Sequence, residues 1–185
     1  MLSVNFSEFP QLETQRLILR RIAATDAEVV LFLRSSDEVM QYIDKEKAKD
    51  ISEAMGFVDR IENAFINNEG ITWVIELKDK PGEMVGTIGF WRMIKDHYRA
   101  EIGYTLHPGL WGRGIMTEAL HKCIEYGFNT LQLHSIEAHI NPGNAASAGV
   151  LEKSGFVREA YFREDFFFKG QFRDTAIYSL LTPHR

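Results

Sequence analysis

The sequence has few of the features that mark secreted, membrane-spanning or nucleic-acid-binding proteins. Its single cysteine, Cys123, excludes an internal disulfide and a thiolate metal cluster. No window approaches the roughly 18 apolar residues that a membrane span needs, and residues 1–15 contain no basic segment followed by an apolar run. These absences predict a cytoplasmic protein with no membrane partner.

Basic residues are also scarce. The chain has 21 Lys and Arg against 26 Asp and Glu, a formal charge of -5, and the basic residues are scattered along it. This distribution argues against direct binding to nucleic acid. The six histidines show no ligand spacing with carboxylates, so no metal is expected. With 185 residues, 45% of them apolar, the chain is expected to form a single domain over 1–185.

Hydrophobic periodicity predicts a mixed order of helices and strands. We expect helices over about 25–34, 50–66, 115–128 and 144–155, and strands over about 15–22, 71–77, 84–93, 100–106, 133–140 and 172–180, with further extended segments at 156–160 and 166–169. The charged run at 45–49 is expected to be solvated. This order predicts an α/β fold whose sheet is partly antiparallel and carries helices on its faces.

The stretch 107–120 joins a strand to a helix through a glycine-rich loop. Gly112 and Gly114 remove side chains where the helix begins, so free amides and the positive end of the helix dipole can face one anion, such as a pyrophosphate. A tight turn that needs glycine only for its backbone angles is the alternative. Cys123 lies on the apolar stripe of the following helix, which indicates packing rather than catalysis.

Two motifs resemble those of the GNAT superfamily of acetyl-CoA-dependent N-acetyltransferases, and within it the ribosomal-protein N-terminal (alanine/serine) acetyltransferase group. WGRGIMTEA at 111–119 is similar to the pyrophosphate loop and its helix, and NPGNAASAGVLEKSGF at 141–156 is similar to the second cofactor motif. The order of elements agrees over about 14–181. The resemblance implies a mostly antiparallel, splayed sheet of about seven strands with helices on both faces, and acetyl-CoA in the cleft.

The same resemblance assigns cofactor-binding residues. They are expected to be Leu106, Gly109, Leu110, Trp111, Gly112, Arg113, Gly114, Ile115, Asn144 and Ser147. Leu106 would pair its backbone with the pantetheine arm, and Asn144 would combine cofactor contact with helix capping. Two positions depart from the family pattern. Gly109 stands where many members have Gln or Arg, and Leu151 stands where many have a tyrosine general acid. Within the subgroup, Ser147 can replace that tyrosine.

Acetyl transfer to an amine also requires removal of a proton from the ammonium. Glu101 is the predicted base, because it precedes the loop by one strand length and faces opposite to Ile102 and Tyr104. Solvation or ion pairing is the alternative explanation for this glutamate. His97, His107 and His139 are alternative bases.

The sequence therefore predicts a cytoplasmic transferase that acetylates a primary amine, first of all a protein N-terminus such as that of a ribosomal protein. A small amine, namely a polyamine, an amino acid or an antibiotic, is the alternative acceptor, and a non-catalytic acyl-CoA-binding module is an alternative of another class. The chain is expected to be a monomer or a homodimer, the latter formed through its aromatic C-terminal hairpin.

Overall fold

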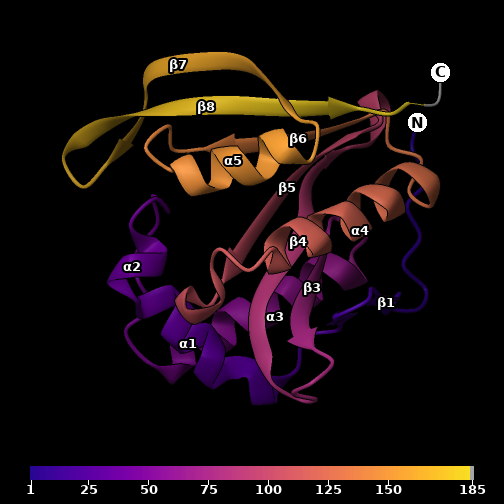
Figure 1. Ribbon diagram of the computed structural model, residues 1–185, viewed down its shortest axis with the longest axis vertical. Coiled ribbons are helices and arrows are strands. Elements are labelled where there is room, and N and C mark those ends of the chain that lie inside the picture. The colour runs from indigo at the N-terminus through magenta and orange to yellow at the C-terminus, as the bar shows by residue number, and fades with distance from the viewer. Residues whose placement is uncertain (184–185) are drawn as a thin grey trace.

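The computed structural model describes residues 1–183 and contains one eight-stranded sheet, in the order β1-β2-β3-β4-β5-β6-β8-β7 (Figure 1). The strands are β1 (Leu12–Glu13), β2 (Leu17–Arg20), β3 (Ile71–Leu77), β4 (Met84–Ile94), β5 (Arg99–Leu106), β6 (Ser135–Ile140), β7 (Val157–Phe168) and β8 (Gln171–Leu181). The helices are α1 (Ala27–Ser35), α2 (Asp37–Met40), α3 (Ile51–Ile66), α4 (Ile115–Asn129) and α5 (Ala145–Lys153), with 3-10 turns η1 (Ala24–Asp26), η2 (Lys95–His97) and η3 (Pro108–Leu110).

All neighbouring strands are antiparallel except β5 and β6. These two run parallel, and their pairing covers only three positions, from Arg99 opposite Ser135 to Glu101 opposite Glu137. Beyond Glu101 the remaining residues of β5 have no partner in β6. The mostly antiparallel, splayed α/β sheet is therefore confirmed. The count of eight strands exceeds the expected seven because the two-residue β1 adds an edge.

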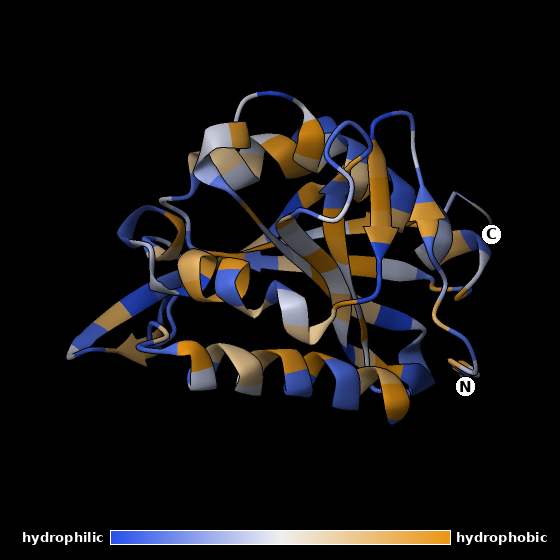
Figure 2. Ribbon diagram, turned by 90° about the horizontal axis from the view of Figure 1, so that it is seen from below, coloured by the Kyte–Doolittle hydropathy of each residue, from blue (hydrophilic) through white to orange (hydrophobic). Residues whose placement is uncertain are grey.

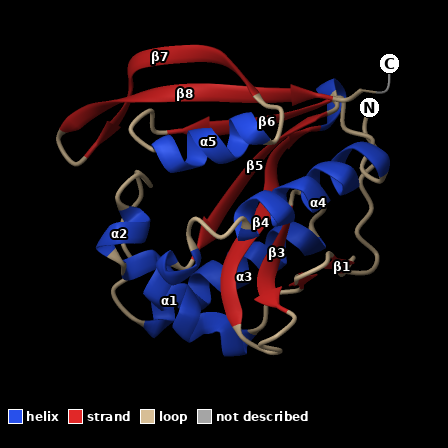
Figure 3. Cartoon of the chain, in the orientation of Figure 1, coloured by secondary structure: helices blue, strands red, loops and turns tan. Residues whose placement is uncertain are grey.

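Helices cover both faces of the sheet (Figure 3). Helices α1 and α3 pack through Val30, Leu33, Val58 and Ile61 against Val74 of β3. On the other face, α4 contributes the apolar stripe that includes Leu120 and the fully buried Cys123. Figure 2 shows the corresponding pattern, in which hydrophobic strands lie between helices that carry both hydrophobic and hydrophilic residues. Burial of apolar surface on both faces stabilises the sheet around the β5–β6 gap.

The C-terminal hairpin is longer and more continuous than the sequence predicted. The segments at 156–160 and 166–169 form parts of one strand, β7, whose register against β8 shifts twice, between Arg158 and Ala160 and between Phe162 and Phe166. These irregularities interrupt the alternation that sequence reading relies on. The Lys169-Gly170 turn is as expected, since both residues have positive φ, 47° and 78°, as a tight hairpin turn requires.

Two segments far apart in the sequence, the loop after α2 and the β7–β8 hairpin, contact each other near the β5–β6 gap. The segment 41–50 after α2 reaches the β7–β8 hairpin, because Asp44 contacts Arg173 at 3.9 Å and Glu46 pairs with Lys169 at 3.3 Å. Figure 1 shows α2 and its loop lying below the hairpin. The loop and the hairpin therefore border one side of the gap. No helix among the described residues is long and apolar enough to cross a membrane.

Candidate active site

The glycine-rich loop presents free backbone amides at the start of α4. Gly112 and Gly114 have φ of +71° and +73°, and a Cβ added at Gly112 would meet no atom within 4 Å. Within residues 1–183, the amides of Gly112, Arg113 and Gly114 donate to no other group. Three free donors beside the positive end of a 15-residue helix form a site suited to a phosphate group.

The preceding turn uses its amides internally. The N–H of Gly109 donates to Nδ1 of His107 at 3.1 Å, Leu110 donates to the His107 carbonyl, and Trp111 donates to the Pro108 carbonyl. The amides at positions 109–111 therefore stabilise the turn itself. The backbone amides left to bind an anion are those of residues 112–115. The ring of His107 also stacks on Phe32 at 4.8 Å between centroids, so this histidine has a structural role.

An ion pair that the sequence did not reveal supports the loop from Arg16, the residue just before β2. Arg16 donates from Nε to Glu118 of α4 at 2.6 Å and from Nη1 to the Arg113 carbonyl at 3.0 Å. Glu118 also accepts from the Thr14 hydroxyl. Although burial raises the pKa of Glu118, the hydrogen bonds from Thr14 and Arg16 outweigh it and lower that pKa. Arg16 therefore compensates a carboxylate that would otherwise repel an anion in the first turn of α4.

The gap beside β5 exposes backbone groups to a ligand. The amide of His107 donates to the Val85 carbonyl in β4, so alternation turns the backbone groups of Tyr104 and Leu106 away from β4 and into the gap. The Leu106 carbonyl already accepts from the Trp111 indole at 2.9 Å. Strand-like pairing with a pantetheine arm therefore has the N–H of Leu106 and both backbone groups of Tyr104 available.

Helix α5 and strand β5 bring two hydroxyl groups together on one side of the sheet. Asn144 caps the helix, with its Oδ1 accepting from the Ser147 amide at 3.0 Å. Ser147 is buried, and its Oγ lies 2.9 Å from the Tyr104 hydroxyl. Burial raises the pKa of Tyr104 to about 12, so this phenol stays protonated at neutral pH. Leu151 is fully buried in the core and offers no acid. Sequence reasoning missed Tyr104, because its 43-residue separation from Ser147 leaves no local pattern.

Glu101 lies on the opposite side of β5, at the last position paired with β6. The residue is 8% exposed, and its Oε2 accepts from Nη1 of Arg92 at 2.9 Å. No described residue bonds to Oε1, so one carboxylate oxygen can accept a proton. Trp91, the β4 partner of Glu101, covers Gly103 so closely that an added Cβ would lie 1.9 Å from the ring.

A second carboxylate accompanies Glu101. Glu137 of β6 stands in register with it, pairs with Arg99 at 2.9 Å and contacts Nε2 of His139 at 3.2 Å. Of the three candidate histidines, His139 is the one linked to the predicted base, because it contacts Glu137, the β6 partner of Glu101. His97 lies in η2, exposed, with no ion pair among the described residues. Sequence reasoning missed Glu137, whose alternation within β6 gave no sign of its partner strand.

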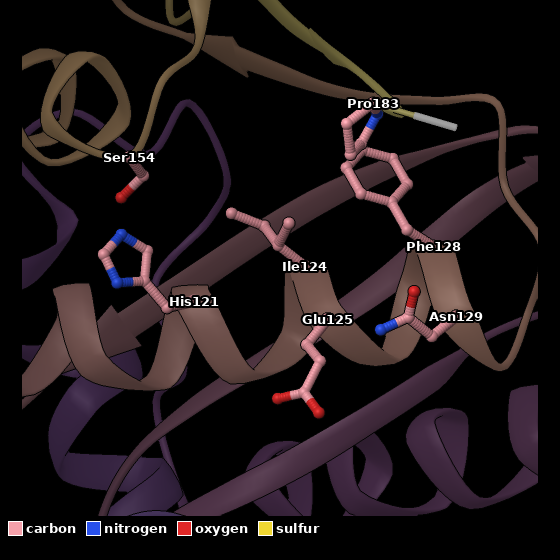
Figure 4. Close-up of a pocket in the computed structure, with 7 residues that line it drawn as sticks. All are labelled: His121, Ile124, Glu125, Phe128, Asn129, Ser154 and Pro183. Carbon is pink, nitrogen blue, oxygen red and sulfur yellow. The ribbon is translucent and has the colours of Figure 1, made fainter. Parts of the chain in front are cut away.

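Two pockets open on the surface formed by the described residues. One of about 280 Å³ lies between the turn before α5 and the hairpin, lined by Asn141, Pro142, Gly143, Tyr161, Phe172, Arg173 and Asp174. It adjoins the second motif and the loop–hairpin contact. The other, of about 310 Å³, lies on α4, where His121, Ile124 and Phe128 point toward Ser154 and Pro183 (Figure 4). None of the predicted site residues lines this second pocket, so it is separate from the gap.

Comparison with known proteins agrees with this arrangement. Residues 16–157 match the acetyltransferase (GNAT) domain family. An uncharacterized N-acetyltransferase, YoaA of Bacillus subtilis (strain 168), is 39% identical over 175 residues, which cover 95% of this chain and 98% of the relative. The [ribosomal protein uS5]-alanine N-acetyltransferase of Escherichia coli (strain K12) is 32% identical over 102 residues, 55% of this chain and 53% of that protein.

A solved structure provides a comparison of the fold. The spermidine N-acetyltransferase of Vibrio cholerae, in complex with CoA and spermine, superposes with a TM-score of 0.79 at 23% identity, covering 91% of this chain and 96% of that one. At this identity the likeness concerns the fold alone. The family match covers most of the chain, YoaA matches it over nearly its whole length, and the sheet has an open gap beside a glycine-rich loop. The chain therefore belongs to the GNAT acetyltransferase family and is an acetyl-CoA-dependent N-acetyltransferase.

Proposed function

We propose that this enzyme transfers the acetyl group to the free amine of a protein N-terminus, by direct attack of the amine on the thioester. The observation that carries the mechanism is the placement of Glu101 and the Ser147–Tyr104 pair on opposite sides of β5, at the edge of the gap. The resemblance to the uS5-alanine N-acetyltransferase supports the choice of acceptor. Small amines remain the alternative acceptors.

The amides of residues 112–115 would hold the pyrophosphate of acetyl-CoA, and Arg16 would support them. Asn144 would contact the cofactor arm with the amide group that capping leaves free. When bound, acetyl-CoA supplies an activated acyl carbon. The glycine loop, with its free amide donors and the open space at Gly112, fits the pyrophosphate of this molecule.

Proton transfer would be divided between the two sides of β5. Glu101 would attract the acceptor ammonium and take its proton through the free oxygen Oε1, directly or through water. On the other side, the Ser147 hydroxyl would donate a proton to the departing sulfur, and Tyr104 would orient that hydroxyl. The carbon–nitrogen bond forms as the carbon–sulfur bond breaks. Nitrogen loses two protons between the ammonium and the amide: Glu101 passes one to solvent, and the other balances the proton that sulfur gains.

A screen of acceptors for turnover of acetyl-CoA tests this function. The panel should include peptides with free Ala or Ser N-termini, the same peptides with blocked N-termini, polyamines and single amino acids. Thiol release together with the mass of the acetylated product is the measurement. Release with free but not blocked peptides is the expected result. Turnover of polyamines only would refute the protein N-terminus, and binding of acetyl-CoA without turnover of any amine would indicate a non-catalytic module.

A further inference from the structure

The side of β5 that carries Glu101 also carries several positive charges without carboxylate partners. Arg34 lies over the Phe57 ring at 4.4 Å and Arg60 lies 5.7 Å from the same ring, while Lys45 lies 6.0 Å from the Trp91 ring. None of these three cations has an ion pair within residues 1–183. We name Arg34, Lys45, Arg60 and Arg92 the basic cluster. In a chain with a net charge of -5, such a local excess is unexpected.

The loop after α2 directs Lys45 into this cluster. Its neighbours Asp44 and Glu46 contact Arg173 and Lys169 of the β7–β8 hairpin, whereas Lys45 turns to Trp91 on β4. Trp91 in turn stands opposite Glu101, the predicted base, and Arg92 pairs with that base. The basic cluster therefore adjoins the side of β5 where the acceptor amine would meet Glu101.

The charges within the cluster repel one another. Loss of surrounding water, followed by the charges of Arg34 and Arg92, lowers the pKa of Lys45, and Glu101 is the one nearby anion that opposes these effects. Burial, followed by the charge of Arg60, likewise lowers the pKa of Arg34. One carboxylate offsets only part of the repulsion among four like charges, and a second, bound anion would reduce the remaining cost in stability.

Building on the proposed function, we infer that the acceptor carries a carboxylate near its reacting amine, and that Lys45 and Arg92, backed by Arg34 and Arg60, bind this carboxylate. The amine would lie toward Glu101 and Glu137, and the carboxylate toward the basic cluster. Acidic side chains near a peptide N-terminus and the carboxylate of a free amino acid share this chemistry. A polycationic acceptor would meet repulsion here.

Matched acceptors test the inference. Peptides beginning Ala-Glu-Glu, Ala-Gln-Gln and Ala-Lys-Lys, together with free glutamate and spermidine, should be compared by kcat/KM at low and high salt. The expected order is acidic, neutral, basic, with about a tenfold advantage of acidic over neutral peptides, the combined effect of two partly exposed charge pairs. High salt should reduce this advantage. Free glutamate as the best acceptor would identify an amino acid as the source of the carboxylate, and the acidic peptide would identify a protein.

Substitutions in the basic cluster test whether it causes the preference for acidic peptides. Lys45→Gln should bring the acidic and neutral peptides near parity, and Lys45→Glu should favour the basic peptide. Lys49→Gln is the matched control, because Lys49 belongs to the same loop but has no contact with Trp91 or Glu101. The dissociation constant of CoA should stay unchanged in all three variants.

Three outcomes contradict the inference. Equal kcat/KM for the three peptides would overturn it, as would spermidine as the best acceptor. A loss of CoA affinity in Lys45→Gln with the peptide preference unchanged would assign the cluster to the cofactor. In each of these cases acetylation continues, so acetyl transfer to an amine survives. Turnover of the peptides alongside spermidine would also keep the protein N-terminus as an acceptor. Binding of acetyl-CoA without turnover of any amine would instead overturn the proposed function and the inference together.

Discussion

The glycine loop allows a test of cofactor binding in which the conformational cost can be separated from the loss of ligand. Gly112 has a left-handed φ of +71°, and an added Cβ would meet nothing within 4 Å. In Gly112→Val the cost to the free protein is therefore conformational, about 1–2 kcal/mol for a side chain in the left-handed region. For a chain of this size, that cost corresponds to a fall in Tm of about 2–8 °C.

The rise in Tm caused by acetyl-CoA should be larger than the fall caused by the substitution in the free protein. Acetyl-CoA at a hundredfold excess over its Kd stabilises the native state by about 2.7 kcal/mol, which raises Tm by about 5–10 °C. Gly112→Val should lose this rise, because a branched side chain would either turn the loop amides or occupy the space of the phosphates. Thermal unfolding with and without acetyl-CoA measures both effects.

Gly82→Val is the matched control for this experiment. Gly82, in the β3–β4 turn, has a φ of +86° and equally open surroundings, so its free-protein cost should be similar. Its acetyl-CoA rise should equal that of the wild type. If Gly112→Val and Gly82→Val show the same rise, the amides at the start of α4 do not bind the cofactor and the assignment of the loop is wrong.

Further predictions concern the two sides of β5. Ser147→Ala should lower kcat by about 10²-fold with little change in acetyl-CoA affinity, as for loss of a general acid, whereas a raised KM for acetyl-CoA alone would assign Ser147 to binding. Tyr104→Phe keeps the partly buried ring and should cost about tenfold in kcat. Because burial raises the pKa of Tyr104 to about 12, wild-type kcat should not fall between about pH 8 and 10 through loss of this proton, and a fall that Tyr104→Phe abolishes would contradict this. Glu101→Gln should lower kcat about 10²-fold and weaken acceptor binding, with partial recovery in alkaline buffer that deprotonates the amine, and wild-type rates at every pH would exclude Glu101 as the base.

Much of the fold could be predicted because periodicity and glycine chemistry are local. The strand at β5, the loop and the stripe of α4 lie within one continuous stretch, so the geometry of Gly112 and Gly114 follows from their own sequence. Capping of α5 by Asn144 is equally local. The free amides at the start of α4 were predictable for the same reason.

Features that depend on strand order could not be predicted. Nothing in β6 alone indicates that Glu137 stands beside Glu101, because parallel strands are joined by a long crossover and their register is set by packing. The pairing of Arg16 with Glu118 spans 102 residues. In the run at 45–49, Lys45, Glu46 and Lys49 are exposed as expected, but Ala48 is buried and Lys45 lies near Trp91, because the loop packs against α1 and β4. Single-sequence patterns carry no information on such contacts.

The early end of β5–β6 pairing also affects how the backbone exchanges with solvent deuterium. In an uninterrupted sheet, central strands protect their amides through ladder hydrogen bonds, and exchange then requires extensive opening. Beyond Glu101, the amides of Tyr104 and Leu106 face a gap rather than a strand. These two central amides should exchange as quickly as those of a sheet edge in the free enzyme, and should slow when an amide-bearing cofactor arm fills the gap, so a ligand would complete the hydrogen-bond ladder of the sheet.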